Sequence, residues 1–234
     1  MRILVIQNYP GTPLGAVGRA LDAAGIGTRL VAAYDGEPVP ERLSDEIGLV
    51  VLGGAQSALA DAEYPFLPAV CDLIRTAHDQ DTPILGICLG AQLIARAFGG
   101  QNVLDRAVEF GWQHVNATPA GCTDPVIGAI GAGAPLFHWH TDTVELPPGA
   151  VHLASSAHTP NQAFRLGRAT YATQFHFEVA EPEARQWSSS FADVIARHTP
   201  DWQSRLDEEA ARHAPDADRA GLSLARRWVQ LLRD

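Results

Sequence analysis

The chain has 234 residues, of which 46% are hydrophobic and 19% are charged, and its formal net charge at pH 7 is −10. This composition is ordinary for a globular protein, and the lack of any basic run argues against nucleic acid or an anionic membrane as the main partner. No apolar run in the sequence approaches the roughly 20 residues that a membrane-spanning helix needs.

The first hundred residues alternate between apolar strands and amphipathic helices. Strands are predicted at residues 2–7, 28–33, 47–54 and 83–88, and helices at 14–25, 64–80 and 89–100. Continuous apolar runs are typical of strands that are covered on both faces. Their alternation with helices predicts right-handed crossovers, and so an α/β fold with a doubly wound, mostly parallel central sheet.

After residue 100 the pattern changes. Antiparallel strands added to the same sheet are expected at residues 108–119, 143–147, 151–156, 161–167 and 169–177. The Gly-rich segment 124–140 predicts a short helix mixed with turns. Without repeats or a linker, residues 1–234 are expected to form a single domain, with 181–234 as a C-terminal helical extension packed on it.

The segment PILGICLG, residues 83–90, places Cys88 at a strand-to-helix turn between Gly86 and Gly90. A nucleophile on such a turn has a strained backbone and crowded neighbours two residues away, and glycine at both positions removes the clash. The helix N-terminus would favour a thiolate, and the N–H of Leu89 would point at a carbonyl under attack. The pattern predicts a catalytic cysteine.

A cysteine in an apolar strand is more often a packing residue than a nucleophile, so the two glycines are what favour catalysis. Cys71, in a predicted helix, and Cys122, in a predicted loop, lack such a setting and are interpreted as structural or incidental. Three cysteines without a CxxC pair indicate neither a zinc site nor a disulfide framework, and favour a reducing cytoplasm. The sequence MRILVIQNYP becomes polar too early for a signal peptide.

A cysteine nucleophile needs a base, and the base needs a group that orients it. His176 and Glu178, in the segment TQFHFE, are two residues apart and would face the same side of an extended backbone. Glu178 would then hold one imidazole nitrogen while the other faces the thiol. His138 and His140 could form a metal pair, but no further ligand stands at a recognised spacing, so neither a metal nor a cofactor is expected.

Gly53 and Gly54 end the third predicted strand. They could form an ordinary tight turn. Their place at the carboxyl end of a strand, where doubly wound sheets bind ligands, favours close approach of the backbone to a ligand. The N–H of Gly54 would then be a second oxyanion donor.

Four motifs, in this order, resemble those of the class I glutamine amidotransferase family. VVLGGAQS resembles the oxyanion strand, GICLGAQ the nucleophile motif, WHTDTVELP a Trp-His-Gly-Asp-Thr segment, and QFHFE the closing His-Pro-Glu motif. The resemblance is strongest to standalone members related to the amidotransferase domain of GMP synthase, and it implies their flavodoxin-like fold. It runs from the first strand to about Glu178, and the C-terminal helices are only loosely matched.

The resemblance implies a cysteine-dependent attack on the γ-amide of glutamine or of a γ-glutamyl compound. Cys88 would form a γ-glutamyl thioester and release ammonia. His176 would activate the thiol and protonate the leaving ammonia, and Glu178 would orient His176. The N–H groups of Gly54 and Leu89 would form the oxyanion hole.

Two further residues are expected to bind substrate because of the same resemblance. Gln92 corresponds to a position that contacts glutamine in the family. His140 lies in the segment from Trp139 to Asp142 that would wall the pocket and hold the α-amino and α-carboxylate groups.

The chain departs from the family pattern at three positions. Ala55 stands where proline is usual, Phe177 replaces the proline of His-Pro-Glu, and Thr141 replaces a glycine. Phe177 removes a rigid backbone constraint between the base and its orienting group. The departures leave the identity of the substrate more open than the thiol chemistry.

Three interpretations of the function follow. In the first interpretation, the protein releases ammonia from glutamine for a synthesis reaction. The chain lacks the pyrophosphatase loop of a synthetase, so this ammonia would have to pass to a separate synthetase subunit. In the second interpretation, the protein is a free γ-glutamyl peptide hydrolase. The third is a catalytically degenerate relative that binds a metabolite or a partner protein.

Overall fold

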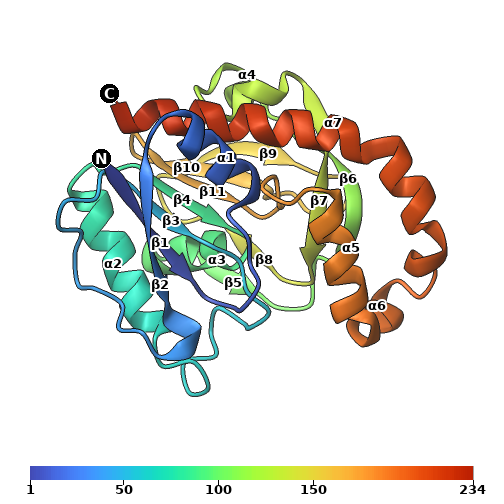
Figure 1. Cartoon of the computed structure of the whole chain (residues 1–234), viewed down its shortest axis with the longest axis horizontal. Coiled ribbons are helices and arrows are strands. Elements are labelled where there is room, and N and C mark those ends of the chain that lie inside the picture. The colour runs from blue at the N-terminus through green and yellow to red at the C-terminus, as the bar shows by residue number, and fades with distance from the viewer. Residues whose placement is uncertain (234) are drawn as a thin grey trace.

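The computed structural model describes residues 1–233, and its centre is a nine-stranded mixed sheet (Figure 1). The parallel part runs in the order β2-β1-β3-β4-β11, with β1 at Arg2–Gln7, β2 at Gly27–Ala32, β3 at Leu49–Val51, β4 at Ile84–Ile87 and β11 at Thr170–Thr173. The sheet continues antiparallel through β10 (Ala163–Leu166), β9 (Val151–Ser155), β6 (Glu109–Ala117) and β7 (Gly133–His140). The predicted fold class is confirmed.

Helices cover both faces of the parallel strands. Helices α1 (Gly15–Ala23) and α7 (Trp202–Gln230) lie on one face, and α2 (Leu67–Asp79) and α3 (Leu89–Ala97) lie on the other (Figure 1). Alternate residues of each strand therefore enter two separate cores, as Ile3 and Leu4 of β1 do. Burial on both sides is the reason that these strands are apolar throughout.

A third core lies beside the antiparallel strands. Helices α5 (Glu181–Ser190) and α6 (Ala192–His198) pack with the first half of α7 against β6 and β7. The remaining elements are α4 (Pro119–Thr123), the two-stranded pair β5 (Gln101–Val103) and β8 (Thr143–Glu145), and short 3-10 helices at Ala33–Asp35, Ile127–Ile130 and Leu231–Arg233. None of the described helices is both long and apolar enough to cross a membrane.

The prediction for residues 124–140 was only half right. A 3-10 helix forms at Ile127–Ile130, but Gly133–His140 is strand β7, which pairs with β6 along its whole length, from Glu109 opposite His140 to Asn116 opposite Gly133. The glycines and proline of this segment are local breaking signals. Backbone pairing with β6, which these local signals do not reveal, outweighs them.

Two of the strands expected to extend the sheet antiparallel differ from the prediction. The strand at 143–147 is β8, which pairs with β5 outside the main sheet, and the one predicted at 169–177 is shorter and runs parallel to β4. Strand β11 ends at Thr173, and His176 is joined to the sheet by one bridge to Phe137 of β7. His176 and Glu178 therefore lie beyond the strand, on an irregular segment whose position depends on its neighbours.

Candidate active site

Cys88 occupies the turn between β4 and α3 with a strained backbone, at φ 51° and ψ −106°. A Cβ atom on Gly86 would lie 2.6 Å from the carbonyl carbon and oxygen of Gly90, and one on Gly90 would lie 2.0 Å from the carbonyl oxygen of Val51. Real Cβ atoms do not approach backbone this closely. The steric need for both glycines, predicted from the sequence, is confirmed.

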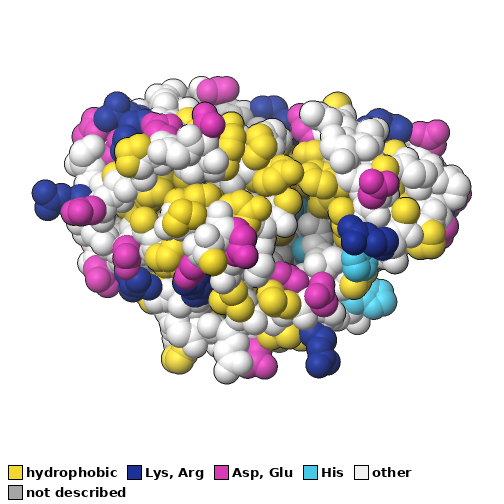
Figure 2. Space-filling view, turned by 90° about the horizontal axis from the view of Figure 1, so that it is seen from below, with side chains coloured by type: hydrophobic (Ala, Val, Ile, Leu, Met, Phe, Trp, Pro, Cys, Tyr) yellow, Lys and Arg dark blue, Asp and Glu magenta, His cyan; other side chains and the backbone are white. Residues whose placement is uncertain are grey.

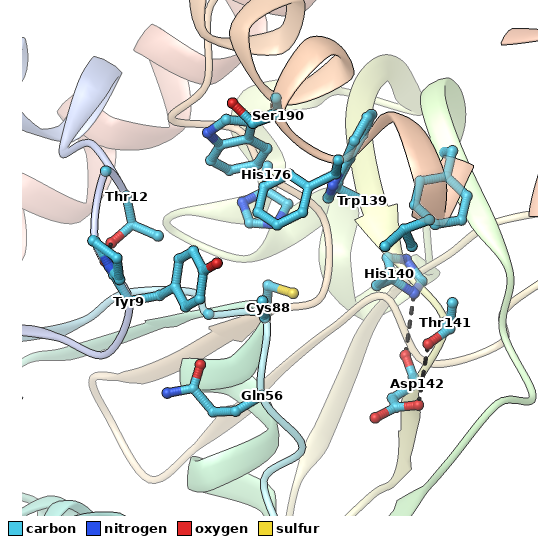
Figure 3. Close-up of a pocket in the computed structure, with 18 of the residues that line it drawn as sticks. Tyr9, Thr12, Gln56, Cys88, Trp139, His140, Thr141, Asp142, His176 and Ser190 are labelled. Carbon is cyan, nitrogen blue, oxygen red and sulfur yellow. Dashed lines mark hydrogen bonds between the residues drawn. The ribbon is translucent and has the colours of Figure 1, made fainter. Parts of the chain in front are cut away.

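His176 and Glu178 form a buried pair beside Cys88. The Nδ1 atom of His176 lies 2.7 Å from Oε1 of Glu178, and the ring lies close to Cys88 (Figure 3). Burial alone would lower the pKa of His176, but the charges of Glu178 and Cys88, with hydrogen bonds to both, raise this pKa to about 10. The protonated form of the imidazole is therefore favoured beside the sulfur of Cys88.

The glycine pair that ends β3 lies against these groups. A Cβ atom on Gly53 would be 3.1 Å from Cε1 of His176, and one on Gly54 would be 2.7 Å from Cδ2 of Leu89. In the described chain, the backbone N–H groups of Gly54 and Leu89 have no hydrogen-bond acceptor. Both predicted oxyanion donors are thus free beside the candidate nucleophile.

Two glutamines complete the surroundings of the thiol. The Nε2 amide of Gln174 donates to Sγ of Cys88 at 3.5 Å, and its Oε1 accepts from Nε2 of Gln92 at 3.3 Å. Gln92 is buried and lines the cleft, and its predicted contact with substrate stays a prediction. Sequence reasoning missed Gln174. Its position two residues before His176 on an apolar segment was the available signal.

His140 lines the cleft, but both of its ring nitrogens have protein partners. Its Nδ1 lies 3.1 Å from the carbonyl oxygen of Asp142, and its Nε2 lies 3.3 Å from Nδ1 of His138 and 3.4 Å from Oε2 of Glu109. The predicted role of His140 in substrate binding stays a prediction. Sequence reasoning missed Glu109, an acidic residue at the start of β6, directly before the apolar side chains of Phe110 and Trp112.

Glu109, His138 and His140 are buried, and their spacing would also suit a metal ion. However, Oε2 of Glu109 already accepts hydrogen bonds from Thr159 and Gln162, each at 2.6 Å. These two short bonds use both lone pairs of Oε2, and Oε1 already accepts a hydrogen bond from Ser156 at 2.6 Å. Burial alone would raise the pKa of Glu109, but the hydrogen bond with His140, the nearby His138 and the hydroxyls of Ser156 and Thr159 lower this pKa to about 2. The geometry favours a hydrogen-bonded network.

Cys88, His176 and Gln92 line a cleft of about 450 Å³ at the carboxyl ends of the parallel strands. Tyr9 and Gln56 lie on one side of Cys88, and Trp139 and His140 lie on the other (Figure 3). The surface seen from below is hollowed beside a group of hydrophobic side chains (Figure 2).

The three departures from the family pattern are accommodated in different ways. Ala55 and Thr141 line the cleft. Phe177 does not: its side chain is 3% exposed and lies in the core shared with α1 and α7, with its ring against Phe175. The cleft is therefore not filled by Phe177.

The other two cysteines lie away from this cleft. Cys71 is buried on α2, and burial raises the pKa of its thiol to about 11. Cys122 is exposed near the end of α4. Neither has a histidine or carboxylate hydrogen-bonded to it in the described chain, so the interpretation of both as structural or incidental is retained.

The fold and the cleft define an α/β protein with a candidate cysteine nucleophile. The family model "Glutamine amidotransferase class-I" matches residues 16–191. The chain belongs to the class I glutamine amidotransferase family, as the motifs predicted.

Individual relatives support this assignment. The chain is 34% identical over 148 residues to the glutamine amidotransferase-like protein YfeJ of Salmonella typhimurium, and this match spans 62% of each chain. It is 32% identical over 203 residues to one of the subunits of the glutamine-hydrolyzing GMP synthase of Natronomonas pharaonis, and this match covers 83% of this chain and 98% of that relative. A crystal structure of a glutamine amidotransferase from Thermotoga maritima superimposes with a TM-score of 0.86 over 100% of this chain and 99% of that one, at 24% identity, which shows the shared fold.

Proposed function

We propose that this protein is a cysteine-dependent amidase that hydrolyses the γ-amide of glutamine or of a γ-glutamyl compound. The observation that carries the proposal is the buried His176–Glu178 pair beside Cys88. Cys88 itself occupies a turn that is possible only because Gly86 and Gly90 have no side chains. The cleft above the thiol is open to a ligand, and family membership supplies the reaction class.

The proposed reaction begins with attack of the Cys88 sulfur on the γ-carbonyl carbon. Negative charge develops on the carbonyl oxygen, where the free N–H groups of Gly54 and Leu89 would stabilise it. His176 gives its proton to the departing nitrogen, the C–N bond breaks, and a γ-glutamyl thioester remains. His176 then takes a proton from water as the water attacks the thioester carbon, the C–S bond breaks, and glutamate leaves while the sulfur of Cys88 is restored.

Glu178 would keep His176 in position and in the correct tautomer through this cycle. Its carboxylate holds Nδ1, so the opposite ring nitrogen is the one that can exchange a proton with the sulfur and the substrate. The hydrogen bond of Gln174 to Cys88 would help to hold the sulfur in place.

The released ammonia has two possible destinations. The relation to a GMP synthase subunit of similar length favours transfer to a separate synthetase. A free γ-glutamyl hydrolase needs no such partner. The degenerate interpretation is disfavoured, because His176 lies beside Cys88 and Phe177 lies outside the cleft. We also propose that residues 1–234 act as one domain, and that the protein works in the cytoplasm.

The test is glutamate release from glutamine by the whole protein, together with labelling by a chloroketone analogue of glutamine. We expect wild type to release glutamate and to be labelled at Cys88, and Cys88→Ala to lose both. Cys122→Ala, which removes the exposed thiol, should behave as wild type. If wild type hydrolyses no γ-glutamyl substrate and Cys88 stays unlabelled, the proposal is wrong.

A further inference from the structure

The cleft continues beyond Cys88 along a wall that is aromatic and apolar. Strands β6 and β7 and helices α5 and α6 supply this wall, and the loop after β1 faces it. The apolar side chains of this wall are those of Phe110, Trp139, Trp187, Phe191 and Val194. Tyr9 faces them from the loop, and Gln186 and Ser190 of α5 also line the cleft. The volume of about 450 Å³ is in the range of sites that hold drug-sized ligands, about 300–1,000 Å³.

The position of the wall relative to His176 indicates which part of a substrate it would meet. The ring of Trp187 lies 5.0 Å from the ring of His176, at an interplanar angle of 84°. In the proposed reaction, His176 gives its proton to the departing nitrogen. A substituent on that nitrogen would therefore leave the reaction centre next to Trp187.

The wall is also organised before any ligand binds. Trp139 stacks on Phe137 at 5.5 Å and meets Phe110 edge-on at 5.1 Å. Across the cleft, the rings of Tyr9 and Phe191 lie 6.1 Å apart, so the loop after β1 contacts the α5–α6 junction. Rings fixed by such contacts lose little conformational freedom when they bury an apolar group.

The charges of the cleft argue against an amino acid as the leaving group. The chain contains no lysine, and no arginine is among the described residues that line the cleft. A carboxylate on the departing amine would meet aromatic rings, and the nearby His176 cation is already paired with Glu178, so burying this carboxylate there is costly. The carboxylate of Asp142, which lies on the same side of Cys88 as Trp139 (Figure 3), would repel it further.

We propose that the preferred substrate is a γ-glutamyl amide of an apolar, aromatic amine, whose ring occupies this wall. The inference rests on the proposed function, because Cys88 and His176 perform the reaction. The amide C–N bond breaks, His176 protonates the amine, and water cleaves the thioester, so the products are glutamate and the free amine. Free glutamine leaves the wall unfilled.

The experiment compares kcat/KM for γ-glutamylbenzylamide, glutamine and γ-glutamylaspartate, with glutamate release as the readout. We expect the benzylamide to exceed glutamine by about 10- to 100-fold, the gain from burying one aromatic ring. We expect γ-glutamylaspartate to be the poorest substrate.

Val194→Asp places a carboxylate in the wall and should reduce the ratio of benzylamide to glutamine turnover by about tenfold or more. Ala196→Asp makes the same change at an exposed position of α6 and should leave the ratio as in wild type. Chemical denaturation checks that both variants are folded.

The outcomes separate this inference from the proposed function. Faster turnover of glutamine or of γ-glutamylaspartate than of the benzylamide overturns the substrate class and leaves the amidase in place. An unchanged ratio in Val194→Asp overturns the assignment of the wall. If no substrate is hydrolysed and Cys88 resists labelling, the proposed function fails, and the inference fails with it.

Discussion

At the scale of single residues, the charge of the site is concentrated on His176. Its ring is buried, with the Glu178 carboxylate on one side, the Cys88 sulfur on another and the edge-on contact with Trp187 on a third. Within the described chain, the second carboxylate oxygen of Glu178 has no hydrogen-bond partner. The carboxylate therefore acts on His176 alone, and the protonated imidazole is favoured over the neutral one.

The charge on His176 predicts a dependence of stability on pH. Its pKa of about 10 in the folded protein exceeds the ordinary 6.5, so its contribution is complete below pH 6.5 and is lost as the pH rises through about 10. Between pH 7 and pH 10, the free energy of unfolding of wild type should fall more steeply than that of His176→Gln. Urea denaturation measures both slopes. His114→Gln removes an exposed histidine and should keep the wild-type slope; equal slopes for wild type and His176→Gln would contradict the ion pair.

At the scale of elements, the turn from β4 into α3 is fixed by contact with the neighbouring strand. Gly90 lies so close to β3 that a Cβ atom would be 2.0 Å from the carbonyl oxygen of Val51. That oxygen belongs to a buried strand and cannot rotate away as a side chain would. The glycine is therefore needed for sheet packing as well as for the conformation of Cys88.

Gly90→Ala should destabilise the protein by about 3 kcal/mol, the upper end of the usual cost of overpacking. The midpoint of chemical denaturation measures this change. Gly27→Ala in β2 is the matched control, because its added Cβ atom would be no closer than 3.8 Å to any neighbour. We expect it to change stability by about 0.5 kcal/mol or less. Equal midpoints for the two variants would show that the turn can relax without cost.

The same elements show what could be predicted from the sequence. The parallel strands and the turn at Cys88 have local signals, namely continuous apolar runs and glycines two residues on either side of one residue. Strand β7 does not, because its ladder depends on β6, where Glu109 lies opposite His140, with its Oε2 3.4 Å from Nε2 of that histidine. The aromatic wall was missed for a related reason. An amphipathic helix such as α5 reveals that one face is buried, but not which strand or ligand it faces.

At the scale of the whole molecule, a helix from each end of the chain, α1 and α7, contacts the segment that carries His176 and Glu178. The N–H of Ala16, at the start of α1, donates to the carbonyl oxygen of Glu178 at 2.9 Å. From the other end, α7 brings Gly221 so close that a Cβ atom would lie 2.0 Å from the carbonyl oxygen of Phe177. The segment lies beyond strand β11, so these two helices support it together with the single bridge from His176 to Phe137 of β7.

This arrangement predicts that a change on α7, outside the cleft, reduces turnover. Gly221→Ala forces the backbone of Phe177 to move, and with it the two residues on either side that form the charged pair. A displacement of this kind can lower kcat by about 10- to 100-fold, because proton transfer depends on alignment within fractions of an ångström. Steady-state kinetics on glutamine or a γ-glutamyl amide measures kcat.

Gly18→Ala makes the same substitution in α1, where the nearest neighbour is the Leu14 side chain at 3.2 Å, and it should retain wild-type kcat. Since alanine is the better helix former by about 1 kcal/mol, helix propensity cannot explain a loss in Gly221→Ala. A folded Gly221→Ala protein with wild-type kcat would show that α7 does not position the pair.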